Sequence, residues 1–127
     1  MKRIEGKIRS EFPDITALYL FGSRAKKQVK KDSDVDLAAF VRPEKLGQDP
    51  LYELKLNDFF EKQLSEAVDV VIMNKANPIL QHQVLKHGRR LMESDHRART
   101  MLELMSFKKY LDVRHFQRKR RSMEGYG

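Results

Sequence analysis

Apolar residues are spaced along this chain in short blocks, and each block has the period of a helix or of a strand. Ile4, Ile8 and Phe12 recur every four residues, which predicts an amphipathic helix that ends before Pro13. The run from Ile15 to Phe21 is apolar, rich in residues that favour strands, and short enough to be a buried strand. The pattern therefore predicts an opening helix that packs over a first strand.

The middle of the chain contains two more apolar runs with one helical pattern between them. The run from Val35 to Val41 predicts a second strand. The run from Ala67 to Met73 predicts a third, buried strand that is interrupted by one acid, Asp69. Between these strands, a loop containing Gly47 leads into a predicted helix with one apolar face. The apolar residues of that helix are Leu51, Leu54, Phe59, Phe60 and Leu64.

The last third of the chain carries signals for where helices begin and end. Asn77-Pro78 is typical of an N-cap followed by the first helical residue, and Gly88 is expected to end that helix. Arg90 to Met92 predicts a short edge strand, and Ser94-Asp95 can cap a final long helix. We expect the methionines and phenylalanines at helical spacing to be core residues. The apolar residues of the final helix include Met101, Leu102, Met105 and Leu111.

The composition narrows the kinds of site that the chain can form. A length of 127 residues indicates one domain. The chain has no cysteine, which excludes disulfides and thiolate metal sites and agrees with a reducing environment. No apolar run approaches the ~20 residues of a membrane span, and the N-terminal residues lack the apolar core of a secretory signal. We therefore expect a cytoplasmic protein, not associated with a membrane, whose metal ligands would be oxygen atoms.

The net charge of +8 is concentrated near the C-terminus. Residues 107–121 contain seven lysines and arginines and a single acid, Asp112. A helix end of this composition is most often a solvated surface, but its field can also attract phosphates, RNA or an acidic partner.

Two acids, Asp34 and Asp36, stand where the second strand begins. Successive side chains of a strand point to opposite faces, so these two carboxylates are expected to share a face. Keeping both ionised is unfavourable unless a cation lies between them. Upstream, Gly22-Ser23 ends the first strand, and a short helix is expected from Arg24 to Gln28, with its N-terminal amides facing a phosphate.

Asp69 is the second anomaly, because a lone carboxylate inside an apolar strand is unfavourable unless it is paired or bound to metal. If its strand lies beside the second strand, three carboxylates converge and could hold two magnesium ions. Each assignment has an ordinary alternative. The two neighbouring acids can end a turn, Asp69 can form a structural ion pair, the glycine and serine can be a capped strand-to-helix turn, and the charged loop can simply be solvated.

The order Gly22-Ser23, ten residues, then Asp34-x-Asp36 resembles the signature of the DNA polymerase β type nucleotidyltransferase superfamily. The small size and the Gly-Ser-Arg-Ala opening resemble its minimal nucleotidyltransferases, which include antitoxins paired with HEPN ribonuclease toxins. The resemblance covers roughly residues 1–95, so that 96–127 would be a C-terminal helix and basic tail of the same domain. It implies an α/β (α+β) fold with a small mixed sheet flanked by helices.

By this resemblance, the protein would be a metal-dependent nucleotidyltransferase that moves AMP from ATP to a tyrosine hydroxyl of a cognate HEPN toxin. Two Mg²⁺ ions would be the cofactors. The acids Asp34, Asp36 and Asp69 would be both catalytic residues and metal ligands, and the phosphates would be held by Gly22, Ser23 and Arg24. Two alternatives stay open, a non-catalytic antitoxin that acts by binding and nucleotidyl transfer to RNA or a small molecule, with RNA contact through the basic tail.

Overall fold

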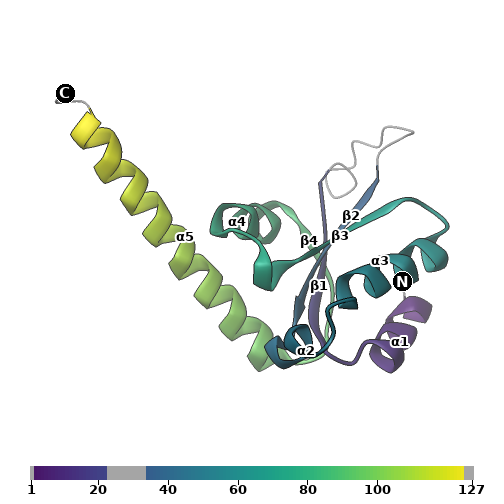
Figure 1. Ribbon diagram of the computed structural model, residues 1–127. Coiled ribbons are helices and arrows are strands. Elements are labelled where there is room, and N and C mark those ends of the chain that lie inside the picture. The colour runs from purple at the N-terminus through teal and green to yellow at the C-terminus, as the bar shows by residue number, and fades with distance from the viewer. Residues whose placement is uncertain (1, 23–33, 125–127) are drawn as a thin grey trace.

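The computed structural model describes residues 2–22 and 34–124 of the chain, and the side chains of residues 4–22 and 34–120. Five α-helices, one short 3-10 helix and four strands lie in these ranges (Figure 1). Their order is α1 (Lys2–Glu11), β1 (Ile15–Phe21), β2 (Val35–Val41), α2 (Pro43–Gln48), α3 (Tyr52–Leu64), β3 (Val68–Ile72), η1 (Met73–Lys75), α4 (Pro78–His87), β4 (Arg89–Glu93) and α5 (His96–Glu124). No helix in the described ranges is both long and apolar enough to cross a membrane.

The four strands form one mixed sheet in the order β3-β2-β1-β4. β1 is antiparallel to both of its neighbours, whereas β2 and β3 are parallel. A parallel pair needs a crossover connection, which α2 and α3 provide between β2 and β3. The predicted fold class is therefore confirmed, and β4 lies at a sheet edge as the sequence predicted.

Helices cover both faces of the sheet, with α1 and α3 on one side and α4 and α5 on the other (Figure 1). The first face carries a core that includes Ile8, Leu18 and Phe60. The second face carries a smaller core that includes Phe40 and Val84. Because strand side chains alternate, even-numbered residues of β2 point toward α4 and α5.

The predicted boundaries of α4 and α5 are confirmed by their contacts. The Asn77 side chain accepts a hydrogen bond from the Leu80 backbone N–H at 2.9 Å, and Pro78 is the first helical residue. Gly88 ends α4, and a Cβ on it would lie 2.9 Å from the Leu20 carbonyl oxygen, so its lack of a side chain lets the turn pack on β1. Asp95 Oδ1 accepts from the backbone N–H at the start of α5 at 3.0 Å.

Two expectations about the connection after β2 were wrong. The residues around Gly47 form α2 instead of a loop, because Pro43 at the first helical position is already set for a helix. Leu51, which caps α3, and Leu54 within it are 54% and 67% exposed, although the sequence assigned them to the buried face. The buried stripe is Tyr52, Leu56, Phe59 and Phe60, whose spacing of i, i+4, i+7 and i+8 is more continuous.

The expectation that the regularly spaced apolar residues of α5 are core was wrong for most of them, although Leu102 packs against the core on the α4 face. Met101, Met105 and Leu111 are 57%, 49% and 47% exposed. The side of α5 that contacts the body carries Arg99 and Ser106, which are buried. The yellow C-terminal end of α5 extends away from the sheet in Figure 1, so its apolar residues have no part of the fold to pack against.

Candidate active site

Gly22 and Asp36 meet where β1 ends and β2 begins. In the β1–β2 ladder, Phe21 pairs with Asp36, so Gly22 follows directly beside that carboxylate. Gly22 has φ +73°, a backbone conformation that favours glycine. A Cβ built on Gly22 would lie 2.3 Å from Asp36 Oδ2. Glycine is therefore required here both by the backbone conformation and by the close approach of the carboxylate.

Asp69 lies opposite Asp36 on the neighbouring strand. The two residues are Cα partners in the parallel β2–β3 ladder, so their side chains leave the same face of the sheet. This is the face covered by α4 and α5. The sequence predicted a buried strand around Asp69, and this was wrong at the acid itself: Asp69 is exposed because it lies near the start of an edge strand.

Asp34 directly precedes β2 and is exposed. Its charge and that of Asp69 both act on Asp36. Burial is the largest cause that raises the pKa of Asp36 above its ordinary value, and the negative charges of Asp69 and Asp34 raise it further. Asp34 and Asp69 therefore lie near enough to Asp36 for their charges to act on it, and we call these three residues the acid cluster.

No cation balances this cluster within the described residues, since none of the ion pairs there involves Asp34, Asp36 or Asp69. The donors present are carboxylate oxygens, the ligands that Mg²⁺ prefers. Among the described residues, no three acidic or histidine side chains are already arranged so that they could hold a metal ion together. The donor chemistry fits a divalent cation, and the metal-binding roles stay predictions.

Two of the predicted phosphate contacts cannot be placed. Ser23 and Arg24, together with the short helix predicted from Arg24 to Gln28, lie outside the described residues. Of the predicted phosphate-binding residues, Gly22 alone is described.

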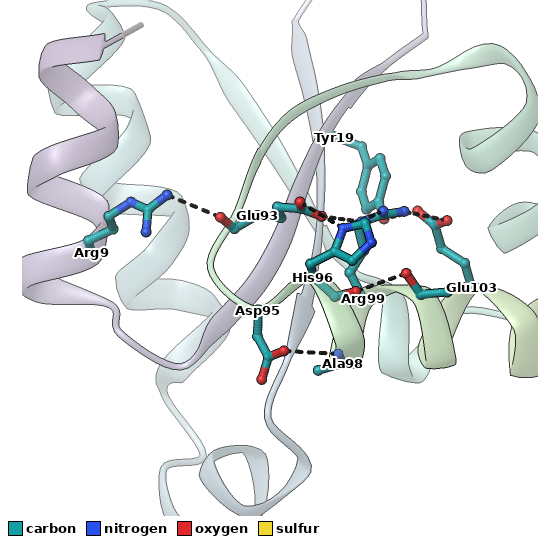
Figure 2. A network of polar contacts seen from close by, with 9 residues as sticks. Arg9, Tyr19, Glu93, Asp95, His96, Ala98, Arg99 and Glu103 are labelled. Atoms are coloured by element: carbon teal, nitrogen blue, oxygen red, sulfur yellow. Dashed lines mark hydrogen bonds and ion pairs between the residues drawn. The ribbon is translucent and has the colours of Figure 1, made fainter.

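A second polar group lies where β1 and β4 meet the first turns of α5, and the sequence did not single it out (Figure 2). Arg99 of α5 donates to Glu103 at 2.8 Å and also to Glu93 of β4. The Tyr19 hydroxyl of β1 donates to Glu103 at 2.6 Å. We call these four residues the arginine cluster. The spacing of Arg99 and Glu103, four residues apart on a helix, was the available signal, whereas their contacts with β1 and β4 depend on the fold.

Charges in the arginine cluster compensate one another. The hydrogen bond from Arg99 is the largest cause that lowers the pKa of Glu93. Arg99 is buried, and hydrogen bonds from its guanidinium to Glu93 and Glu103 raise its pKa against the effect of burial. Burial is the main cause that raises the pKa of Tyr19, so that its hydroxyl stays a neutral donor. This cluster attaches the first turns of α5 to the sheet.

Solved structures with a similar fold include toxin–antitoxin complexes. A toxin–antitoxin structure with AMP-PNP matches with a TM-score of 0.73 and 22% identity, over 98% of this chain and 94% of that chain. A tri-AMPylated HEPN toxin of Shewanella oneidensis in complex with an MNT antitoxin matches with a TM-score of 0.65 and 23% identity, over 98% and 92%. At these identities the likeness shows the fold.

The sequence itself gives a family match. No curated protein matches the chain. The family described as "Polymerase beta, Nucleotidyltransferase" matches residues 3–97, which include the whole sheet and the acid cluster. The chain therefore belongs to the polymerase beta nucleotidyltransferase family.

Proposed function

We propose that this protein is an antitoxin that transfers AMP from ATP to a tyrosine hydroxyl of a cognate HEPN toxin. The observation that carries the proposal is the position of Asp36, which lies between the backbone of Gly22 on one side and Asp69 on the other. The turn at Gly22, here called the glycine turn, lies beside the acid cluster. This arrangement suits a triphosphate that binds together with divalent metal ions. A cytoplasmic location is part of this proposal.

In the proposed reaction, the oxygen of the tyrosine hydroxyl forms a bond to the α-phosphorus of ATP. The bond from that phosphorus to the oxygen that bridges it to the β-phosphate breaks, and pyrophosphate leaves. The hydroxyl proton passes to a carboxylate, for which we assign Asp69. Two Mg²⁺ ions bound by Asp34, Asp36 and Asp69 would supply the positive charge that the triphosphate and the attacking oxygen need.

The residues of the chain contribute mainly by positioning. Because Gly22 has no side chain, a phosphate can approach the backbone next to Asp36. We assign the β- and γ-phosphates to the backbone of Gly22 together with Ser23 and Arg24. Burial and then the negative charges of Asp69 and Asp34 raise the pKa of Asp36, so a bound cation would favour its ionised form.

The assignment of the acceptor rests on the structural relatives. One of them contains a tri-AMPylated HEPN toxin together with an MNT antitoxin, and another contains AMP-PNP. Both alignments cover 98% of this chain, so they include α5 with the nucleotidyltransferase core. An AMP group on the toxin would block its ribonuclease.

The test is incubation of the protein with labelled ATP, Mg²⁺ and the product of the adjacent reading frame. We expect label on that product, and Asp36→Ala should abolish it. Asp58→Ala is the matched control, because Asp58 is an exposed acid of α3 that pairs only with Lys62 among the described residues. An Asp36→Ala variant that still neutralises the toxin fully would replace the proposal with neutralisation by binding. Label on RNA would replace it with an RNA-directed transferase.

A further inference from the structure

A hollow of about 370 Å³ lies at the outer edge of β3, directly beside the acid cluster. Asp69 belongs to its lining, so the hollow and the cluster share a residue. Val71 of β3, Ala76 after η1 and Leu80 of α4 form an apolar part of its wall, and the polar side chains of Glu53, Lys75 and Asn77 also line it. Val71 and Leu80 are partly buried and pack against the core on the α4 face of the sheet.

The order of the strands places this hollow opposite the glycine turn. Gly22 follows β1, Asp36 stands on the central strand β2, and Asp69 stands on the edge strand β3. The hollow lies on the side of Asp69 that has no further strand. In phosphoryl transfer the attacking and leaving oxygens are roughly in line, on opposite sides of the phosphorus. If pyrophosphate leaves toward Gly22, the attacking oxygen must come from the β3 side.

The lining and size of the hollow suit one aromatic side chain that carries a hydroxyl. Val71, Ala76 and Leu80 offer an apolar wall to a ring, while the exposed carboxylate of Asp69 can accept a hydrogen bond from the hydroxyl. The volume is near the lower limit of small-molecule sites, which suits a single side chain better than a nucleoside with its phosphates.

We propose that this hollow is the acceptor subsite, which receives the tyrosine ring of the partner protein and directs its hydroxyl toward Asp69. The proposal rests on the proposed function and adds to it the place and the chemistry of acceptor recognition. It assigns acceptor positioning to Val71, Ala76 and Leu80. None of these residues is an acid, and none belongs to the glycine turn.

The first test fills the hollow and measures binding of the two substrates separately. Ala76→Phe should raise the KM for the acceptor protein at least tenfold and leave the dissociation constant of Mg²⁺-ATP within twofold of the wild type. Ala76→Ser is the matched control, because it leaves the hollow open and should keep both values. Val71→Phe repeats the test from the strand side if Ala76→Phe does not fold.

The results distinguish this proposal from the proposed function. If the wild type labels the acceptor and a folded filling variant labels it with the same KM, the hollow is not the acceptor subsite although the transferase activity stands. If the filling variants weaken Mg²⁺-ATP binding instead, the hollow holds the nucleoside, and the proposal is overturned.

A second test needs no transfer activity. Titration of p-cresol, which has the ring and hydroxyl of tyrosine, into the labelled wild-type protein should shift the NMR signals of Val71, Ala76 and Leu80. The shifts should disappear in Ala76→Phe. An absence of shifts at these three residues in the wild type would overturn the subsite even if AMP transfer is found, whereas their presence would support it even if the toxin proves not to be the acceptor.

Discussion

The acid cluster and the arginine cluster both lie beside β1, and their charges are arranged in opposite ways. In the acid cluster, Asp36 has negative neighbours, and no ion pair of the described residues compensates it. In the arginine cluster, one buried guanidinium donates to two carboxylates, and one of these carboxylates also accepts from a tyrosine hydroxyl (Figure 2). The first arrangement raises the pKa of a carboxylate, and the second lowers one.

This difference separates a binding site from a structural contact. A group of like charges destabilises the free protein and becomes favourable only when a cation arrives. A compensated group is satisfied within the fold and attracts no ligand. The two clusters should therefore respond in opposite directions to mutation and to pH.

The largest expected effect is on catalysis by the acid cluster. Asp36→Asn keeps the shape of the side chain but removes its charge, so we expect AMP transfer to fall by about 10³-fold. The melting temperature in metal-free buffer should rise or stay equal, because repulsion from Asp34 and Asp69 is removed. Asp58→Asn should change neither value. A variant that loses stability without losing activity would contradict the contrast between the clusters.

The next effect concerns the turn beside the same cluster. Gly22→Ala places a Cβ against Asp36 Oδ2 and strains a backbone at φ +73°. We expect the transfer rate to fall by about 10²-fold because the carboxylate is displaced. The strain should also lower the free energy of unfolding by about 1–2 kcal/mol. Gly6→Ala is the control, since a Cβ there has no heavy atom within 4 Å. Unchanged transfer by Gly22→Ala would show that the close approach has no catalytic role.

Mutation of the arginine cluster should reduce stability and leave AMP transfer unchanged. Arg99→Met removes the guanidinium that joins Glu93 and Glu103, so we expect a loss of about 2 kcal/mol in the free energy of unfolding. Transfer per folded molecule should stay unchanged. Arg97→Met, at an exposed position of the same helix turn, is the control. Urea unfolding with a parallel activity assay measures both quantities, and a selective loss of transfer would place the arginine cluster in the active site.

The smallest effect is the pH dependence of the stability changes caused by Asp36→Asn and by Arg99→Met in metal-free buffer. The raised pKa of Asp36 means that the folded state binds this proton more tightly than the unfolded state, so its penalty is present above the raised pKa. The stability that Asp36→Asn gains over the wild type should therefore shrink as the pH falls from the raised pKa toward the ordinary pKa of an aspartate.

For Glu93 the sign is reversed. Its lowered pKa gives a contribution that is present above the ordinary value and is lost as the pH falls through the lowered one. The stability lost in Arg99→Met should therefore shrink in a more acidic pH range than the stability gained in Asp36→Asn. Melting curves at several pH values measure both differences, and a common pH range for the two would remove the contrast.

The sequence alone determined the local parts of this molecule. The limits of β1 and β2 and the cap at Asn77 follow from residue type and from a period of two or four residues, which act over a few neighbours. The Gly-Ser and Asp-x-Asp spacing was sufficient to indicate the family, which the match over residues 3–97 confirms. Each of these signals lies within a short stretch of chain.

The tertiary structure decided what depends on distant partners. It paired β3 with β2 in the register that sets Asp69 opposite Asp36, and it joined Tyr19 to Glu103 across 84 residues of sequence. It also left Met101 and Leu111 of α5 exposed, although their spacing resembles that of core residues. Periodicity indicates which side of an element is apolar, but only the packed fold determines whether another element covers that side.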